Sequence, residues 1–348
     1  MKAAVYEGAR KIIIKERPDP KAAPGEVIVK IQYCGICGTD VHAYMHGGLI
    51  APGLVLGHEN VGTISEVGTE VEGWQVGDRV VAGPPGPCGE CYYCRHGQGT
   101  ICMHGFERTN GLSPGNDGGN AEYMRVKDPG GMLVKIPDHL SFEDAVLTDT
   151  LGVAFRGIRE SRFRLGDNVV VVGAGAIGLS AVQLLKIAGA RHITVLNRSA
   201  GKRELALTLG ADLALNPVAE GDGLREKVMA MYDGVGAKIC FECAGNGEAA
   251  RTAVGLVKSG GQVLVLGVGG DPIPVPEAEL VVREIDLRAT LAYDNEEMHL
   301  VVDFLAQGRI NTKGIITDII GLDDIVEKGY ERLAASSDPV KIVVAPQR

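Results

Sequence analysis

The stretch Asn168-Val169-Val170-Val171-Val172-Gly173-Ala174-Gly175-Ala176-Ile177-Gly178 decides the fold of the second half of the chain. It opens as a continuous apolar run, as a strand buried on both faces of a parallel sheet requires. The run leads directly into the glycine pattern G-x-G-x-x-G, and apolar residues at helical spacing follow. A glycine pattern between a strand and a helix predicts a dinucleotide-binding turn. Gly173 allows the tight turn, Gly175 admits the pyrophosphate, and Gly178 lets the helix pack closely.

Beyond this turn the sequence alternates between strands and helices. Further apolar strands are expected at residues 192–196, 238–242 and 262–267, and helical stretches at 201–209 and 249–257 lie between them. Alternation of this kind predicts an α/β fold with a doubly wound parallel sheet.

The end of the second strand indicates which dinucleotide binds. An Asp or Glu about 20 residues after the glycine motif bonds the ribose 2′-hydroxyl of NAD. Here Asn197 takes that place, and the forked donor Arg198, which suits a phosphate, follows it. The loss of the acid and the presence of Arg198 both favour NADP. NAD remains usable if Asn197 bonds the 2′-hydroxyl as a neutral partner. Other residues expected near the cofactor are Ser199, Lys202, Leu266 and Val268.

The first half of the chain carries side chains suited to a metal. Gly57-His58-Glu59-Asn60-Val61-Gly62 sets an imidazole beside a carboxylate in a glycine-framed turn, and Cys37 lies 21 residues before His58. Zinc accepts sulfur, nitrogen and oxygen ligands, so these three side chains predict a zinc site if the fold brings them together.

Four cysteines within fifteen residues form a second group: Cys88, Cys91, Cys94 and Cys102. Thiolates at this spacing can close a tetrahedral zinc shell with no open position, which is a structural rather than a catalytic site. An iron–sulfur cluster also uses four cysteines and is the alternative. A disulfide framework is disfavoured because the chain is large and shows no secretory leader.

The run G-H-E-x-x-G-x-x-x-x-x-G, the cysteine group and the glycine motif together resemble the zinc-dependent medium-chain alcohol dehydrogenase family, in its secondary-alcohol, sorbitol and threonine dehydrogenase-like branch. The resemblance covers nearly the whole chain. It implies a GroES-like, partly open β-barrel catalytic domain at residues 1–150, with a structural zinc lobe at about 86–104. It further implies a Rossmann domain at 151–290 and a return segment at 291–348 that completes the catalytic domain.

The resemblance also implies the ligands of a catalytic zinc. Cys37 and His58 would bind it, and Glu59 would bind it either directly or only while substrate exchanges. Asp149 matches the acidic version of the remaining ligand, and the alternative for this residue is an exposed helix carboxylate.

Further roles follow from the same resemblance. Thr39 would bond the substrate oxygen, and His42 would pass its proton toward solvent. Asp40 would support the zinc-bound histidine from behind. Lys341 matches a basic residue that reaches the cofactor phosphates.

Composition limits the remaining classes of function. A net charge of −9 disfavours a nucleic-acid surface, and no apolar run reaches the length of a membrane span, so a cytoplasmic location is expected. The expected activity is hydride transfer between a nicotinamide cofactor and a secondary alcohol or polyol. A threonine-like amino-alcohol or cyclic alcohol is the alternative substrate, and a non-enzymatic dinucleotide-binding protein is the third reading. A homodimer or homotetramer is expected, joined through residues 263–268 and 273–275.

Overall fold

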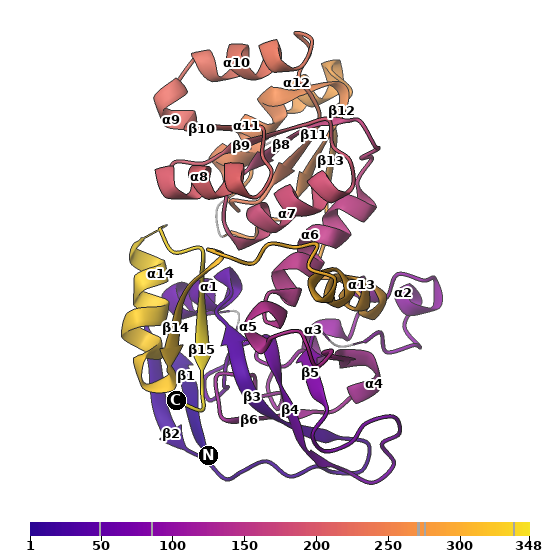
Figure 1. Cartoon of the computed structure of the whole chain (residues 1–348), viewed down its shortest axis with the longest axis vertical. Helices are drawn as coiled ribbons and strands as arrows, with labels where there is room; N and C mark the ends of the chain where they lie inside the picture. Colours follow the sequence, from indigo (N-terminus) through magenta and orange to yellow (C-terminus); the bar gives the residue numbers. More distant parts are fainter. Residues whose placement is uncertain (49, 85, 270–271, 275, 337) are drawn as a thin grey trace. The chain divides into compact units, whose positions relative to one another are not determined.

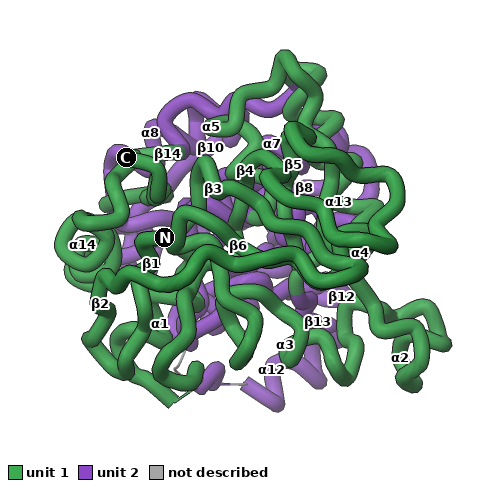
Figure 2. The backbone as a smooth tube through the Cα atoms, turned by 90° about the horizontal axis from the view of Figure 1, so that it is seen from below, with its two compact units in different colours: residues 1–149, 292–308, 316–348 green, residues 150–291, 309–315 purple. Residues whose placement is uncertain are grey.

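The computed structural model describes residues 1–48, 50–84, 86–269, 272–274, 276–336 and 338–348. The chain divides into two compact units (Figures 1 and 2). Unit 1 contains residues 1–149, 292–308 and 316–348, and unit 2 contains residues 150–291 and 309–315. The chain therefore leaves unit 1 to build unit 2 and then returns, with one short stretch, 309–315, going back to unit 2.

Unit 2 is built on a parallel sheet of six strands. Its order is β10-β9-β8-β11-β12-β13, so the first strand in sequence, β8, lies beside the fourth. The strands are β8 (Asn168–Val172), β9 (His192–Leu196), β10 (Leu213–Leu215), β11 (Ala237–Glu242), β12 (Val257–Val265) and β13 (Asp286–Ala289). The chain adds β9 and β10 on one side of β8 and then adds β11, β12 and β13 on the other side. The switch point of the sheet therefore lies between β8 and β11, and ligands of open α/β sheets bind at such a point.

Helices cover this sheet and bury its apolar side chains. They are the larger part of α6 (Thr148–Glu160), α7 (Ala176–Ile187), α8 (Ala200–Thr208), α9 (Pro217–Glu220), α10 (Gly223–Met231), α11 (Gly247–Leu256) and α12 (Glu277–Val282). Val170, Cys240 and Val263, from three neighbouring strands, are fully buried in one core cluster with residues of α10 and α11. The predicted doubly wound α/β fold is confirmed in this unit.

Unit 1 contains a mostly antiparallel sheet of seven strands and a separate hairpin. The path β14-β15-β3-β4-β5-β7 defines the sheet, and β6 pairs with β3. The strands are β3 (Val27–Gly35), β4 (Glu59–Val67), β5 (Arg79–Ala82), β6 (Tyr123–Val126), β7 (Leu133–Lys135), β14 (Ile316–Gly321) and β15 (Lys341–Ala345), with β1 (Lys2–Gly8) and β2 (Lys11–Glu16) forming the hairpin. The return segment thus supplies two strands of this sheet.

Short helices connect the strands of unit 1. They are α1 (Gly38–His46), α2 (Tyr92–Arg95), η1 (Gly99–Ile101), α3 (Gly105–Arg108), α4 (Pro129–Met132), α5 (Phe142–Ala145), α13 (Asn295–Ala306), η2 (Leu322–Asp324), η3 (Ile325–Glu331) and α14 (Arg332–Ala335). Ser141 caps α5, but this helix ends before Asp149, which lies in the first turn of α6. No helix in the described part of the chain is both long and apolar enough to cross a membrane.

Candidate functional site

The turn before β4 brings three metal-binding side chains together. Gly57 has φ +100°, and a Cβ there would lie 2.5 Å from the sulfur of Cys34, so glycine is needed at this position. The tight turn sets His58 and Glu59 against Cys37, which precedes α1. One ligand atom from each of the three lies within 4.8 Å of the other two. The predicted grouping of these side chains is therefore present in the structure.

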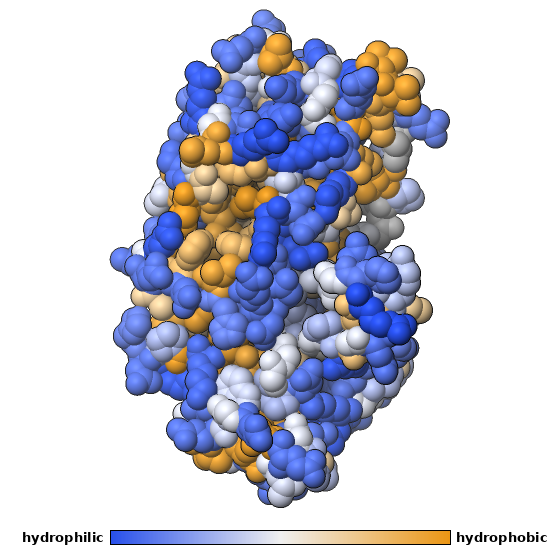
Figure 3. Space-filling model, turned by 90° about the vertical axis from the view of Figure 1, so that its right-hand side faces the viewer, coloured by the Kyte–Doolittle hydropathy of each residue, from blue (hydrophilic) through white to orange (hydrophobic). Residues whose placement is uncertain are grey.

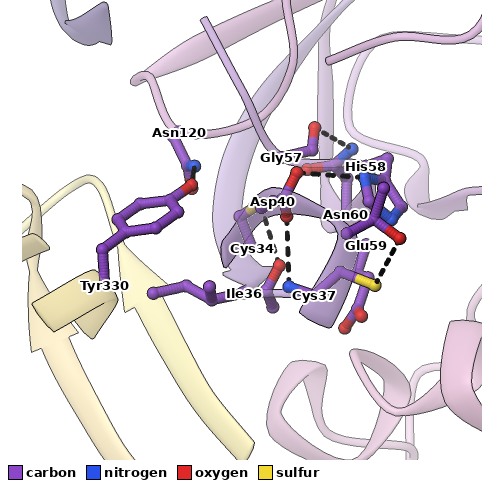
Figure 4. Close-up of polar contacts among 12 residues, drawn as sticks. Cys34, Ile36, Cys37, Asp40, Gly57, His58, Glu59, Asn60, Asn120 and Tyr330 are labelled. Carbon is purple, nitrogen blue, oxygen red and sulfur yellow. Dashed lines mark hydrogen bonds and ion pairs between the residues drawn. The ribbon is translucent and has the colours of Figure 1, made fainter. Parts of the chain in front are cut away.

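Asp40 lies behind this group and holds two of its members (Figure 4). It is fully buried, and its Oδ2 accepts a hydrogen bond from the Cys37 backbone N–H over 3.1 Å. Its Oδ1 lies 3.4 Å from Nδ1 of His58, leaving Nε2 of that ring for a metal. Burial alone lowers the pKa of His58, but the negative charges of Asp40 and Cys37 raise it well above its usual value.

Glu59 already has a cationic partner in unit 1. The Lys341 ammonium donates to both of its carboxylate oxygens over 2.6 Å, and both side chains are almost completely buried. This position corrects the expectation for Lys341, because its charge neutralises Glu59 and its third contact is the backbone carbonyl of Ile36. We therefore assign Lys341 to the metal centre and not to the cofactor phosphates.

Asp149 lies close to this centre but outside the group of three. Its Oδ1 accepts a hydrogen bond from the phenol of Tyr293 over 2.8 Å. Burial raises the pKa of Asp149 to about 6, with Glu59 adding to the rise, while His58 and Tyr293 oppose it. A metal cation bound near this carboxylate would favour its ionised form.

The donor set fits zinc. Thiolate, imidazole and carboxylate are all zinc ligands, and a histidine ligand usually has an acceptor behind its other nitrogen, as Asp40 provides here. The Cys37 thiol also lies 3.7 Å from the Thr39 hydroxyl. His42 is partly buried on α1, and its ring is 4.8 Å from the exposed ring of His46.

The four cysteines of residues 88–102 form the second group that could hold a metal. Their sulfurs all lie within 4.8 Å of one another. Three of the separations are 3.8 Å for Cys88–Cys94, 3.4 Å for Cys91–Cys94 and 3.9 Å for Cys91–Cys102. A zinc–sulfur distance of roughly 2.3 Å gives a tetrahedron whose edge is roughly 3.8 Å. Backbone N–H groups of Cys94 and Met103 lower the pKa of Cys91 to about 6, which favours the thiolate.

The glycine turn after β8 leaves room for a ligand. Gly173 has φ +101°, and a Cβ on Gly178 would lie 1.9 Å from the carbonyl oxygen of Gly173. Gly175 has neither constraint, since its φ is −76° and no described atom outside its immediate neighbours lies within 4 Å of an added Cβ. Open space over the N-terminus of α7 fits a pyrophosphate that approaches the backbone N–H groups.

The residues after β9 lie beside this turn. Asn197 accepts a hydrogen bond from the Ala174 backbone N–H over 3.2 Å, which ties the end of β9 to the glycine turn. Arg198 is exposed, and Ser199 caps α8 without a side-chain hydrogen bond. Lys202, by contrast, is buried, so Arg198 is the better placed cation for a phosphate.

Leu266 and Val268 follow β12 at the same end of the sheet. Leu266 is buried, and its backbone N–H donates to the carbonyl of Glu242 at the end of β11. Val268 is 76% exposed, and its backbone borders Gly245 in the loop after β11. Both therefore belong to the loops at the carboxyl ends of the central strands, where the dinucleotide is expected.

Sequence reasoning missed Tyr293. It lies 144 residues from its partner Asp149, and only the capping pattern Asp294-x-x-Glu297 marks its neighbourhood. That pattern predicts where α13 begins but carries no information about the direction of the preceding side chain.

Comparisons with known proteins agree with this geometry. Residues 23–138 match the alcohol dehydrogenase GroES-like domain, and residues 176–307 match the zinc-binding dehydrogenase domain. The chain is 31% identical to (R,R)-butanediol dehydrogenase of Bacillus subtilis (strain 168), over 99% of this chain and 100% of that protein. It is likewise 31% identical to sorbitol dehydrogenase of the same organism, over 100% and 98%.

Solved structures lead to the same family. A chain assigned as a zinc-binding dehydrogenase from Sinorhizobium meliloti 1021, bound to NADP, matches with a TM-score of 0.90 and 30% identity over 99% of both chains. The alcohol dehydrogenase TADH from Thermus sp. ATN1 matches with a TM-score of 0.85 and 33% identity, again over 99% of both chains. With its metal-binding groups and its dinucleotide turn in one chain, this protein belongs to the zinc-binding alcohol dehydrogenase family.

Proposed function

We propose that this protein is a zinc-dependent oxidoreductase that transfers a hydride between NADP and a secondary alcohol or polyol, or the corresponding ketone. The grouping of Cys37, His58 and Glu59, with Asp40 buried behind it, is the observation that carries the proposal. Relatives named butanediol and sorbitol dehydrogenase support this substrate class. Free thiols at both metal-binding groups are typical of a reducing compartment, so we place the reaction in the cytoplasm.

Each residue of the site has its own role in the oxidation of the alcohol. Zinc supplies Lewis acidity that lowers the pKa of an alcohol hydroxyl. Cys37, His58 and Asp149 would hold the metal, and Glu59 would join them either directly or only while substrate exchanges. Asp40 keeps the His58 ring in position. We assign Thr39 to the hydrogen bond with the substrate oxygen.

The proton has a route away from the metal centre. His42 would accept it from the direction of Thr39, because an imidazole can accept a proton at one ring nitrogen and donate one from the other. Its partly buried position on α1, next to the exposed ring of His46, is compatible with release to solvent.

The preference for NADP rests on Asn197 and Arg198. Without an acid after β9, a 2′-phosphate is not repelled, and the exposed Arg198 offers two parallel donors to it. The related S. meliloti chain was solved with NADP, which supports the same choice.

A coupled assay tests the proposed function. Purified protein would be screened with NADPH and NADH over secondary alcohols, polyols, cyclic alcohols and hydroxy-amino acids, and over the matching ketones. We expect turnover on at least one secondary alcohol or polyol, and loss of that turnover in Cys37→Ser and His58→Ala. Activity on hydroxy-amino acids alone would show that the substrate is an amino-alcohol and not a secondary alcohol or polyol. A folded protein with two bound zinc ions and no turnover on the whole panel would contradict the proposal.

A further inference from the structure

Tyr293 enters the metal centre from the return segment of unit 1. The residue before it, Ala292, has φ +51°, a left-handed conformation that non-glycine residues rarely adopt. The residue after it, Asp294, caps α13 and accepts from the backbone N–H of Glu297. Tyr293 is thus held between a strained residue and a fixed helix end, and strain of this kind persists only where the surrounding structure enforces it.

The phenol of Tyr293 lies in a close-fitting buried slot. Its side chain is 3% exposed, and the neighbouring Met298 is fully buried. A Cβ added to Gly83 would lie 3.2 Å from the Tyr293 hydroxyl and 2.5 Å from the sulfur of Met298. Gly83 and Met298 therefore limit the positions that the ring and its hydroxyl can take.

The only hydrogen bond described for this hydroxyl is to Asp149. It spans 2.8 Å and ends on Oδ1 of the carboxylate. A phenol has one proton to donate, and among the described residues no hydrogen bond ends on Oδ2 of Asp149. The phenol O–H is the donor of this hydrogen bond, and the carboxylate oxygen accepts it.

We propose that Tyr293 is a positioning residue of the metal centre, which holds Asp149 by Oδ1 so that Oδ2 alone is presented to zinc. The inference rests on the proposed role of Asp149 as a ligand. A carboxylate that is fixed before the metal arrives loses less conformational freedom on binding, and one that is held by a single oxygen binds through the other. Hydrogen-bonded partners of metal ligands act in this way in other metal sites.

The test is Tyr293→Phe, which removes the hydroxyl and keeps the ring. Zinc affinity of the Cys37–His58 site is measured by chelator competition on protein that retains its structural zinc, and the visible spectrum is recorded after cobalt(II) replaces the catalytic zinc. Loss of such a partner typically weakens metal binding about 10- to 100-fold. We expect a change of that size and a shifted cobalt spectrum, with the structural zinc retained.

Tyr44→Phe is the matched control. Tyr44 is also buried and also donates to a carboxylate, Glu331, over 2.6 Å, but this pair includes no candidate metal ligand. Its removal should leave zinc affinity and the cobalt spectrum unchanged. An equal loss in both variants would make the effect a general consequence of losing a buried phenol, and would overturn the inference.

Asp149→Asn separates this inference from the proposed function. If Asp149→Asn weakens zinc binding while Tyr293→Phe changes neither affinity nor spectrum, Asp149 is a ligand and only the role of Tyr293 is lost. If neither variant changes zinc binding, Asp149 is not a ligand and both assignments fall.

Discussion

At the scale of single residues, the buried pair of Glu59 and Lys341 is the most informative contact of unit 1. Its members come from β4 and β15, 282 residues apart in the sequence. Both are almost completely buried, so each charge depends on the other for compensation. Because Glu59 also lies within 4.8 Å of the Cys37 and His58 ligand atoms, the ammonium would compete with a zinc ion for this carboxylate.

We predict that Lys341→Met destabilises the protein by about 3–5 kcal/mol, because the Glu59 charge is then buried without a partner. Urea denaturation measures this change, and the double variant Lys341→Met with Glu59→Gln should recover much of it. A contact with the cofactor phosphates would give a different result. The single variant would then weaken NADPH binding and leave the free energy of unfolding unchanged.

A second prediction at this scale concerns the coenzyme. Arg198→Ala should lower the preference for NADPH over NADH by about one to two decades in kcat/KM, because a charged hydrogen bond is worth roughly 1.5–3 kcal/mol. Asn197→Asp should shift the preference in the same direction by repelling the 2′-phosphate. Kinetics with both coenzymes on one ketone measure the two effects. A wild type that prefers NADH would contradict the assignment of Arg198.

The residues that the sequence predicted and those that it missed differ in how local their signal is. Cys37, His58 and the glycine turn lie in short motifs whose chemistry depends on spacing alone. The contact between Tyr293 and Asp149 joins residues 144 apart in the sequence, and the contact of Lys341 with Glu59 joins residues 282 apart. No periodicity within one element specifies such contacts, because the rest of the chain has to fold before the two partners meet.

At the scale of elements, residues 322–335 show where a pattern predicts helix but not its form. The sequence pattern of residues 322–333 predicts one α-helix, whereas the chain forms the 3₁₀ turn η2, the π-helix η3 and then α14. The π-helix carries Tyr330, whose hydroxyl accepts from the Asn120 amide over 3.1 Å beside the Gly57 turn (Figure 4). Tyr330 is fully buried, and its partner Asn120 lies 210 residues earlier, a tertiary contact that helix propensity does not encode.

The cysteine lobe gives the prediction at this scale. Tyr92 in α2, Ile101 in η1 and Met103 after it are 61%, 43% and 64% exposed, so little apolar burial stabilises this lobe. Zinc binding should therefore supply most of its folding free energy. Cys91→Ser should remove one zinc per chain and lower the melting temperature, while Cys37→Ser should remove the other zinc with a smaller thermal effect. Unchanged zinc content and melting in Cys91→Ser would refute the structural role of this lobe.

At the scale of the whole molecule, buried tyrosines predict how stability depends on alkaline pH. Burial, and then the hydrogen bond to Glu331, raise the pKa of Tyr44 to about 12, and burial also raises that of Tyr232. Between pH 10 and about 12 the unfolded chain loses these protons while the folded chain keeps them. The folded state then binds more protons, so the free energy of unfolding should fall as pH rises through this window.

Urea denaturation at a series of pH values checks this fall. Tyr44→Phe should be less stable below pH 10, because it lacks the bond to Glu331, but its stability should decline less steeply above pH 10. Equal slopes for wild type and variant would show that Tyr44 does not contribute to the alkaline loss.

An oligomer is expected, but the structure does not favour residues 263–268 and 273–275 as the interface. Residues 263–265 belong to β12, which pairs with β11 on one side and β13 on the other, so this strand cannot extend the sheet, and Val275 lies outside the described residues. The edge strands of this sheet are β10 and β13, and β13 is the one that lies next to β12. Near it in sequence, Val281, Val282 and Leu291 are 76%, 82% and 58% exposed. Figure 3 shows hydrophobic residues reaching the surface in patches rather than evenly.

An exposed edge strand beside apolar side chains is a template for pairing with a second chain. Two copies related by a two-fold axis would join their β13 strands and bury these valines, and such an isologous contact closes at two chains. Light scattering at micromolar concentration should give at least twice the chain mass of 36.6 kDa. Val281→Asp with Val282→Asp should reduce it to one chain mass, whereas Val218→Asp, which replaces a 65% exposed valine in α9, should not. A wild type of one chain mass would exclude the dimer, and a double variant that remains paired would place the interface elsewhere.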